Sequence, residues 1–352
     1  MNINGIDLDG LAHDALAIDI PPQVKGRTVH IDADFLAYQV TAEKEDGSDQ
    51  KSYEDMQHNA EVAVQTLRDL AAAEHVHLHL TPSTSNKGGR YEQALQRPYQ
   101  GNRVDKPKPR YLGIMREWLA KRYSGTLHQF CEADDGMSSA QYKAIASGDR
   151  NLSIIASKDK DLCMVPGLHM DWDTGEIIDT DDFGHVKLVE RVSSSGAVTK
   201  KLKGFGQKFF WAQMLIGDTA DNIQGLPGVT GEIMNVLKPT KAIEKALAIY
   251  QSPNANPAQK AKAASELTAR KPAACGPATA ILLLDQMHDN KTAFATVKGL
   301  YKRYGDAVGY KHYDTGVDLH WGKVFASEAQ LLWMRREPHN ENCVLNWLKE
   351  IA

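Results

Sequence analysis

The first half of the chain alternates between short apolar runs and longer amphipathic segments. The apolar runs predict buried strands at 27–32, 76–81, 126–131 and 152–157. Apolar residues with a helical period predict helices at 53–73, 111–121 and 132–147. Strands that alternate with helices are typical of βαβ units, which build a largely parallel sheet. We therefore predict an α/β fold with a mainly parallel central sheet flanked by helices.

The pattern divides the chain into three predicted parts. Residues 1–23 read as an N-terminal extension that ends in two prolines, and residues 24–206 as the α/β core. Residues 207–352 have a mostly helical pattern. Within this last part, the stretch 253–271 is rich in Ala, Lys, Pro and Asn. It predicts a linker or an inserted helix.

Two segments of the predicted core lack a helix–strand alternation. Residues 168–204 predict β-hairpins, with turns at 173–175 and 194–196. The segment 82–109 contains Gly, Pro, Tyr and many bases but little core-forming pattern. We predict a loop or a loosely helical flap there.

Composition limits the class of protein. A hydrophobic content of 42% is enough for a sizeable core, and 24% charged residues is ordinary for a globular chain. No apolar run approaches the roughly 20 residues that cross a membrane, and the N-terminus lacks the basic start of a secretory signal. Four scattered cysteines without a C-x-x-C pair fit reduced thiols. These features predict a cytoplasmic protein without a membrane partner.

The charge distribution is more informative than the net charge of −4. Between positions 87 and 110, seven bases stand against two acids. Such a segment is typical of a surface that faces phosphates. The bases are Lys87, Arg90, Arg97, Arg103, Lys106, Lys108 and Arg110.

Carboxylates follow four of the predicted strands and helices. They are Asp32 with Asp34, Glu132 with Asp134 and Asp135, Asp159 with Asp161, and Asp218 with Asp221. The carboxyl ends of parallel strands meet at one edge of a sheet, so we expect these acids to converge. Oxygen ligands without His or Cys favour Mg²⁺ or Mn²⁺, and two such ions about 3.5–4 Å apart suit phosphodiester hydrolysis. Each cluster alone also fits an ordinary helix start or turn, and Asp34 fits a turn acid as well as a ligand.

The order of these clusters resembles the 5′→3′ exonuclease and flap-endonuclease superfamily, and most closely the phage 5′→3′ exonucleases. The resemblance covers roughly residues 27–230. Three motifs carry it. Glu-Ala-Asp-Asp stands at 132–135, Asp-x-Asp-Leu at 159–162, and Gly-Asp-x-x-Asp-Asn-Ile-x-Gly-x-x-Gly at 217–228.

The resemblance implies a PIN-like nuclease core, a two-ion site and a set of catalytic residues. For the first ion it implies Asp32, Glu132, Asp134 and Asp135; for the second it implies Asp159, Asp161, Asp218 and Asp221. We expect Asp134, Asp135, Asp159 and Arg90 to be catalytic, and the 207–352 region to complete the metal site. A phage origin would make the location the host cytoplasm.

The basic segment resembles the family's helical arch, at about 83–110. Residues 97–103 match the family's Pro-x-Tyr-Lys-Gly-Asn-Arg, except that Gln100 replaces the lysine. Thr81 stands where the family often has an Asp, and Lys87 and Arg90 are candidates to supply the missing positive charge. The DNA contacts expected in this segment are Lys87, Arg90, Arg97, Tyr99, Gln100, Arg103, Lys106, Lys108 and Arg110.

Residues 225–231 resemble the hairpin of a helix-hairpin-helix. Through it we expect Gly225 and Gly228 to hold duplex phosphates, with K⁺ as a further ion. A second echo of the motif at 275–280 suggests that about 40 residues interrupt it. A plain Gly-Pro helix start explains that echo equally.

We expect hydrolysis of phosphodiester bonds near DNA 5′ ends, as a 5′→3′ exonuclease or 5′-flap endonuclease. The family resemblance also allows action on RNA primers in RNA–DNA hybrids. No Walker loop or dinucleotide fingerprint occurs, so we expect no nucleotide cofactor. Two alternatives stay open, which are a non-catalytic DNA-binding relative of the same fold and a PIN-type ribonuclease.

Overall fold

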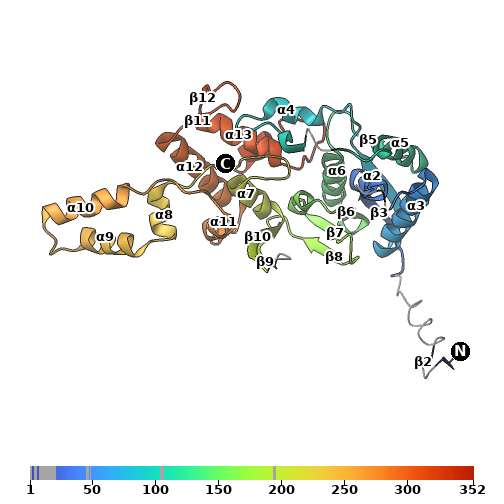
Figure 1. The fold of residues 1–352 in the computed structure, drawn as a ribbon, viewed down its shortest axis with the longest axis horizontal. Coiled ribbons are helices and arrows are strands. Elements are labelled where there is room, and N and C mark those ends of the chain that lie inside the picture. Colours follow the sequence, from blue (N-terminus) through green and yellow to red (C-terminus); the bar gives the residue numbers. More distant parts are fainter. Residues whose placement is uncertain are drawn as a thin grey trace.

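The computed structural model describes residues 2–3, 6–7, 21–44, 47, 49–103, 107–192 and 196–352. Its centre is a six-stranded sheet in the order β5-β4-β3-β6-β7-β8 (Figure 1). All neighbours are parallel except β7 and β8, so the predicted α/β fold with a mainly parallel sheet is confirmed. The strands are β3 (Val24–Asp32), β4 (Ala73–Leu80), β5 (Thr126–Leu127), β6 (Ser153–Ala156), β7 (Gly167–Met170) and β8 (Ile177–Thr180).

Strand β3 is the central strand because its alternate residues are apolar and buried. Val29 and Ile31 are fully buried. Ile31 is in register with Leu78 of β4 and with Ala156 of β6. The last residue of β3, Asp32, therefore emerges at the same edge as the residues that follow β6.

Helices cover both faces of the sheet. On one face, α2 (Ala33–Thr41), α3 (Tyr53–Leu70) and α5 (Leu112–Arg122) pack against a core that includes Ile154. The next residue, Ile155, points to the opposite core, which includes side chains of α6 (Ala133–Ala146) and α7 (Gln207–Ile216). This alternation along β6 is the expected result of a strand buried on both sides.

One predicted strand is much shorter than expected. The sequence predicts 126–131, but β5 contains only Thr126 and Leu127. It lies at the edge of the sheet, where only His79 and Leu80 of β4 pair with it. Beyond it, the side chain of His128 turns inward to His79.

The predicted hairpins are present. Strands β7 and β8 are antiparallel and joined through the predicted turn at 173–175. A second hairpin consists of β9 (His185–Val192) and β10 (Val198–Phe205). The turn predicted at 194–196 falls mostly on Ser194 and Ser195, which lie outside the described residues.

The segment 82–109 contains only short helical pieces among its described residues. They are η1 (Lys87–Gly89), α4 (Arg90–Gln93) and η2 (Gly101–Arg103). The segment therefore fits the predicted loop or loosely helical flap. Two further short turns, η3 (Arg150–Leu152) and η4 (Lys160–Met164), flank β6.

The C-terminal part is mostly helical, as predicted. Helix α7 is buried over nearly its whole length, and the Tyr301 hydroxyl donates to its Met214 carbonyl. No described helix is both long and apolar enough to cross a membrane. The further elements are α8 (Gly231–Leu237), α9 (Lys241–Gln251), α10 (Pro257–Thr268), α11 (Pro277–Leu284), α12 (Asn290–Ala307), α13 (Trp321–Leu332), α14 (Cys343–Glu350), and the short pairs β11 (Tyr310–Lys311) with β12 (Asp318–Leu319) and β1 (Asn2–Ile3) with β2 (Ile6–Asp7).

Helices α9 and α10 extend away from the rest of the molecule (Figure 1). The stretch predicted as a linker or inserted helix contains α10, which Asn256 begins with a reciprocal side-chain cap. Val229 and Ala273 exchange both backbone hydrogen bonds, of 2.7 and 2.9 Å. The excursion between them therefore returns to its starting point, in agreement with the suggested interruption of about 40 residues.

Candidate active site

A cavity of about 1000 Å³ opens at the carboxyl ends of β3 and β6, and acidic side chains line it. Six of the eight predicted metal ligands belong to this lining. We call it the acidic cavity. The six are Asp32, Glu132, Asp134, Asp159, Asp161 and Asp221.

Strand ends place Asp32 and Asp159 side by side. The Oδ1 of Asp32 accepts the Phe35 amide and so caps α2, while its Oδ2 accepts the Ser157 hydroxyl at 2.8 Å. The same hydroxyl oxygen accepts the amide of Asp159 at 2.9 Å. Ser157 therefore ties the end of β3 to the loop after β6.

The first turn of α6 supplies Glu132 and Asp134. Glu132 is the N-cap residue, and negative charge is favourable at this end of a helix. The Thr81 hydroxyl accepts the Ala133 amide at 2.9 Å. Thr81 therefore stabilises the helix start at the position where the resembled family often has an acid.

Asp161, Asp218 and Asp221 form a second group, with ligand oxygens within 4.8 Å of one another. Asp218 and Ile223 exchange backbone hydrogen bonds, which folds 218–223 into a tight turn. A Cβ at Gly217, where φ is +72°, would overlap the carbonyl oxygens of Ile223 and Gln224. Only glycine fits there, which explains why the motif begins Gly-Asp.

Lys160 lies within this second group. Its Nζ is 3.1 Å from Asp161 and 2.8 Å from Asp218. Burial raises the pKa of Asp218, but the Lys160 charge and the hydrogen bonds that this carboxylate accepts together bring its pKa below the usual value. The Oδ2 of Asp218 is nevertheless buried without a hydrogen-bond partner among the described residues. A buried carboxylate oxygen in this state is a free ligand atom for a cation.

The other acids repel one another. Burial, and then the charge of Asp159, raises the pKa of Asp134 well above its usual value. Burial, and then the charge of Asp34, raises the pKa of Asp32 to about 6. Burial, and then the charge of Glu132, raises the pKa of Asp221 to about 6. Without a counter-charge these carboxyls take up protons at a higher pH than ordinary acids do, whereas divalent cations would keep them ionised. The donor set, all oxygen, fits Mg²⁺ or Mn²⁺.

Asp135 does not belong to the cavity lining, and the surroundings of Asp135 and Arg90 argue against the metal, catalytic and DNA-binding roles predicted for them, which stay predictions. Both are nearly inaccessible, at 0% and 1% exposed. The Arg90 guanidinium donates to both Asp135 oxygens, at 2.8 and 2.9 Å, and the Arg335 amide donates to Oδ1. Asp135 is therefore saturated by donors rather than available to a metal, and Arg90 is not available to DNA.

A polar network connects the basic segment with the acids. The Tyr99 hydroxyl donates to Glu132 at 2.9 Å, and the Gln100 amide to Asp221 at 2.9 Å. Lys87 Nζ lies 2.6 Å from Gln100 Oε1 and 3.2 Å from Glu132 Oε1. Tyr99 lines the acidic cavity but is only 4% exposed, and its hydroxyl holds Glu132. Its predicted contact with DNA stays a prediction.

The remaining predicted DNA contacts differ in position. Arg103 and Lys108 line the acidic cavity, and Arg103 also forms a 2.8 Å ion pair with Asp221. Arg97 and Arg110 are exposed outside the lining. Lys106 lies outside the described residues. The structure therefore places two exposed bases at the cavity itself.

The surroundings of Gly225 and Gly228 argue against the phosphate contacts predicted for them. Both glycines are buried, and the Gly225 amide donates to the Glu328 carboxylate at 2.7 Å. Burial raises the pKa of Glu328 to about 7. The Gly225 amide is therefore already occupied within the protein, and the phosphate contacts at Gly225 and Gly228 stay predictions. The predicted K⁺ ion stays a prediction.

Sequence reasoning missed Ser157, Lys160 and Arg335 as members of the site or its support. Lys160 stood between two predicted ligands, and this spacing was a usable signal. Ser157 follows the strand directly and was equally close to the motif. Arg335 is 200 positions from its partner Asp135, and no local pattern connects the two.

No family model matches the sequence, and no curated protein matches it significantly. Among solved structures, the fold is similar to a bacteriophage T5 flap endonuclease, described as a pseudo-enzyme–product complex with DNA and metal ions. The similarity has a TM-score of 0.40 at 14% identity and covers 78% of this chain and 97% of that chain. Because these values are low, we base the function on the residues of the site itself.

Proposed function

We propose that the protein is a magnesium-dependent nuclease that hydrolyses phosphodiester bonds near DNA 5′ ends. One observation carries the proposal, which is that seven carboxylates from four separate segments meet in a cavity with exposed bases at its edge. Structural acids are normally dispersed or paired with bases, because uncompensated carboxylates in contact destabilise a fold. An accumulation of this kind is explained by divalent cations.

The acids divide into two candidate ligand groups. Asp32, Glu132, Asp134 and Asp159 would hold one ion, and Asp161, Asp218 and Asp221 would hold the other. When bound, such ions polarise the scissile phosphate and supply a nucleophile at neutral pH. Lys160 competes for the second group, because its ammonium already contacts Asp161 and Asp218.

The chain's own cations would bind and orient the substrate. Lys87 is 23% exposed in its side chain and lies in the acidic cavity beside Glu132. It is placed to contact the phosphate that reaches the ions. Arg103 and Lys108 would hold neighbouring phosphates of the strand, which makes binding salt-dependent.

The test is digestion of 5′-labelled DNA, as blunt duplex and as a 5′ flap, in Mg²⁺ and in EDTA. We expect short labelled products in Mg²⁺ only, with the faster substrate separating exonuclease from flap cutting. Asp134→Asn should reduce cleavage by about 10³-fold or more, because it removes a charged ligand of the first ion. The matched control is Asp285→Asn, because Asp285 is an exposed acid outside the acidic cavity.

Two other outcomes would replace the proposal. A folded protein that binds DNA and cuts neither substrate would be the non-catalytic relative. A protein that cuts single-stranded RNA faster than DNA would be a ribonuclease. An RNA–DNA hybrid with a labelled RNA 5′ end, run alongside, tests whether primers are also substrates.

A further inference from the structure

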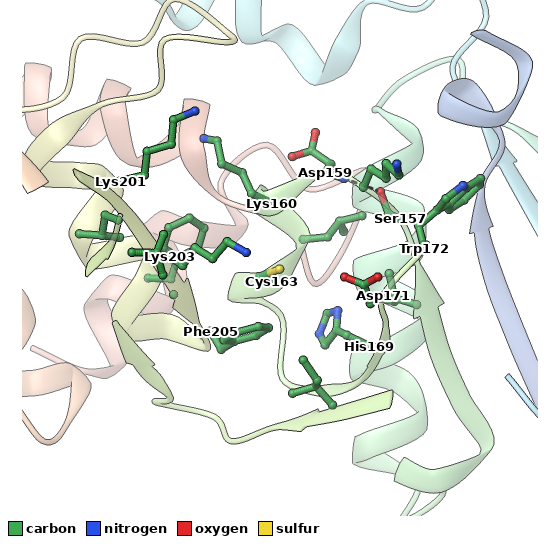
Figure 2. Close-up of a pocket in the computed structure, with 18 of the residues that line it drawn as sticks. Ser157, Asp159, Lys160, Cys163, His169, Asp171, Trp172, Lys201, Lys203 and Phe205 are labelled. Carbon is green, nitrogen blue, oxygen red and sulfur yellow. Dashed lines mark hydrogen bonds between the residues drawn. The ribbon is translucent and has the colours of Figure 1, made fainter. Parts of the chain in front are cut away.

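A second cavity, of about 620 Å³, adjoins the acidic cavity and shares Lys158, Asp159 and Lys160 with it. Figure 2 shows Lys201, Lys203 and Phe205 on one wall and Asp171 with Trp172 on the opposite side. The first wall belongs to the β9–β10 hairpin, and the second follows β7. We call this space the hairpin pocket. Its volume is in the range of roughly 300–1,000 Å³ that is typical of small-ligand sites.

The hairpin presents a basic face to this pocket. Residues alternate in direction along a strand, so Leu202 and Gly204 share one face of β10 and Lys201, Lys203 and Phe205 share the other. Leu202 and Gly204 are buried, and Leu202 belongs to the C-terminal core. Lys201 and Lys203 are exposed on the opposite face, and the whole segment 201–205 borders the pocket.

The bases on this face have no acidic partner. Among the described residues, neither Lys201 nor Lys203 has an ion pair or a side-chain hydrogen bond. Lys200, on the other face, is paired with Glu190 at 3.7 Å. Across the pocket, the amides of Asp173 and Thr174 both donate to Oδ1 of Asp171. Hydrogen bonds, first from the Thr174 amide, and the more distant charge of Lys203 lower the pKa of this carboxyl. The lining carries five bases and four acids, so Lys201 and Lys203 face the pocket without an ion pair and with a small excess of positive charge.

The floor of the pocket is apolar. Ile155, Leu162, Met170 and Phe209 line it and are each at most 2% exposed. The rings of Phe205 and Trp172 stand at its sides (Figure 2). The half-buried rings of Trp172 and Phe205 suit the face of a nucleobase, and lysines without an ion pair suit a phosphate.

We propose that the hairpin pocket binds one unpaired nucleotide of the strand that crosses the acidic cavity. Its base would lie against the half-buried aromatic rings at the sides of the pocket, and its phosphate would lie at Lys201 and Lys203. The shared lining at Asp159 would place this nucleotide next to the cleaved bond. The inference rests on the proposed function, since it names a subsite for the strand being cut.

The experiment measures binding of thymidine 5′-monophosphate by calorimetry in EDTA, where no cation bridges the phosphate to the carboxylates. The double variant Lys201→Gln/Lys203→Gln should weaken binding by about tenfold or more, because it removes both charged phosphate contacts. Lys200→Gln, on the opposite face of the same strand, should change the affinity by less than about twofold. We expect the bound base to quench the fluorescence of Trp172. Trp172→Phe should remove this quenching.

Three results would overturn the inference. They are no binding of thymidine 5′-monophosphate, unchanged affinity in the double variant, or inorganic phosphate binding as tightly as the nucleotide. Failure of the proposed function is recognised separately. Absence of Mg²⁺-dependent cleavage would refute the nuclease, while nucleotide binding in EDTA requires neither metal nor cleavage.

Discussion

At the scale of single residues, Lys87 places its ammonium beside Gln100, the residue that replaces a lysine of the resembled family. Gln100 stands where the resembled family has lysine, and its side-chain oxygen Oε1 accepts a hydrogen bond from the Lys87 ammonium. Lys87 thus brings a positive charge to the place that Gln100 leaves neutral. Glu132 Oε1 holds the same ammonium from the other side, at 3.2 Å.

We expect Lys87→Met to lower the cleavage rate by about 10- to 100-fold with little change in DNA affinity, because a positioned cation acts mainly on the developing charge. Single-turnover rates and a separate DNA-binding isotherm measure the two effects. Lys108→Met, in the same cavity, should instead weaken binding and reduce its salt dependence. Gln100→Lys added to Lys87→Met should recover part of the rate, and equal losses in both single variants would contradict this role.

At the scale of elements, the Arg90–Asp135 pair fastens three segments together. Arg90 begins α4, Asp135 lies in the first turn of α6, and the Arg90 guanidinium also donates to the Trp333 carbonyl just after α13. This contact holds the start of α6, and with it Asp134, in place. Its consequence is structural rather than catalytic.

We expect Arg90→Met to lower the free energy of unfolding by about 3–5 kcal/mol, because it leaves a buried carboxylate without its partner. Urea denaturation in EDTA measures this without any metal contribution. The double variant Arg90→Met/Asp135→Leu should be clearly less destabilised, since both charges are gone. A loss as large in the double variant would show that packing, not charge, is responsible.

At the scale of the whole molecule, buried neutral histidines make global stability depend on pH. Burial lowers the pKa of His169 to about 4, and its Nε2 lies 2.7 Å from the Val165 carbonyl oxygen. Burial lowers the pKa of His30 to about 3 and that of His128 to about 4. The unfolded chain binds these protons near pH 6.5, so stability is full above that pH and is lost as pH falls toward 4.

For His169 alone we expect a loss of about 2 kcal/mol between pH 7.5 and pH 5. His169→Gln keeps a donor for the carbonyl but does not titrate. In EDTA, acidification should therefore lower the unfolding free energy of the unmodified protein more than that of this variant. The carboxyls with raised pKa act in the opposite direction, and they cancel in the difference between the two proteins. A difference that is constant with pH would contradict the neutral His169.

Much of the fold and the composition of the site could be predicted from the sequence. The strand and helix pattern is local, so the parallel sheet and the positions of most acids followed from periodicity. The motif at 217–228 was readable because Gly217 and the turn after it depend on nearby backbone. The pairing of 229 with 273 fits the interruption that the echo of the resembled motif at 275–280 suggested.

Only the tertiary structure decided which acids face the cavity. Asp134 and Asp135 are neighbours in sequence, but successive helical residues point about 100° apart, and just one of them lines the cavity. The partners that occupy Asp135 come from 45 and 200 positions away. Similarly, the unpaired lysines of the β9–β10 hairpin meet the edge of the sheet only after folding. Charge and local geometry are properties of the sequence, whereas burial and pairing depend on contacts between distant segments.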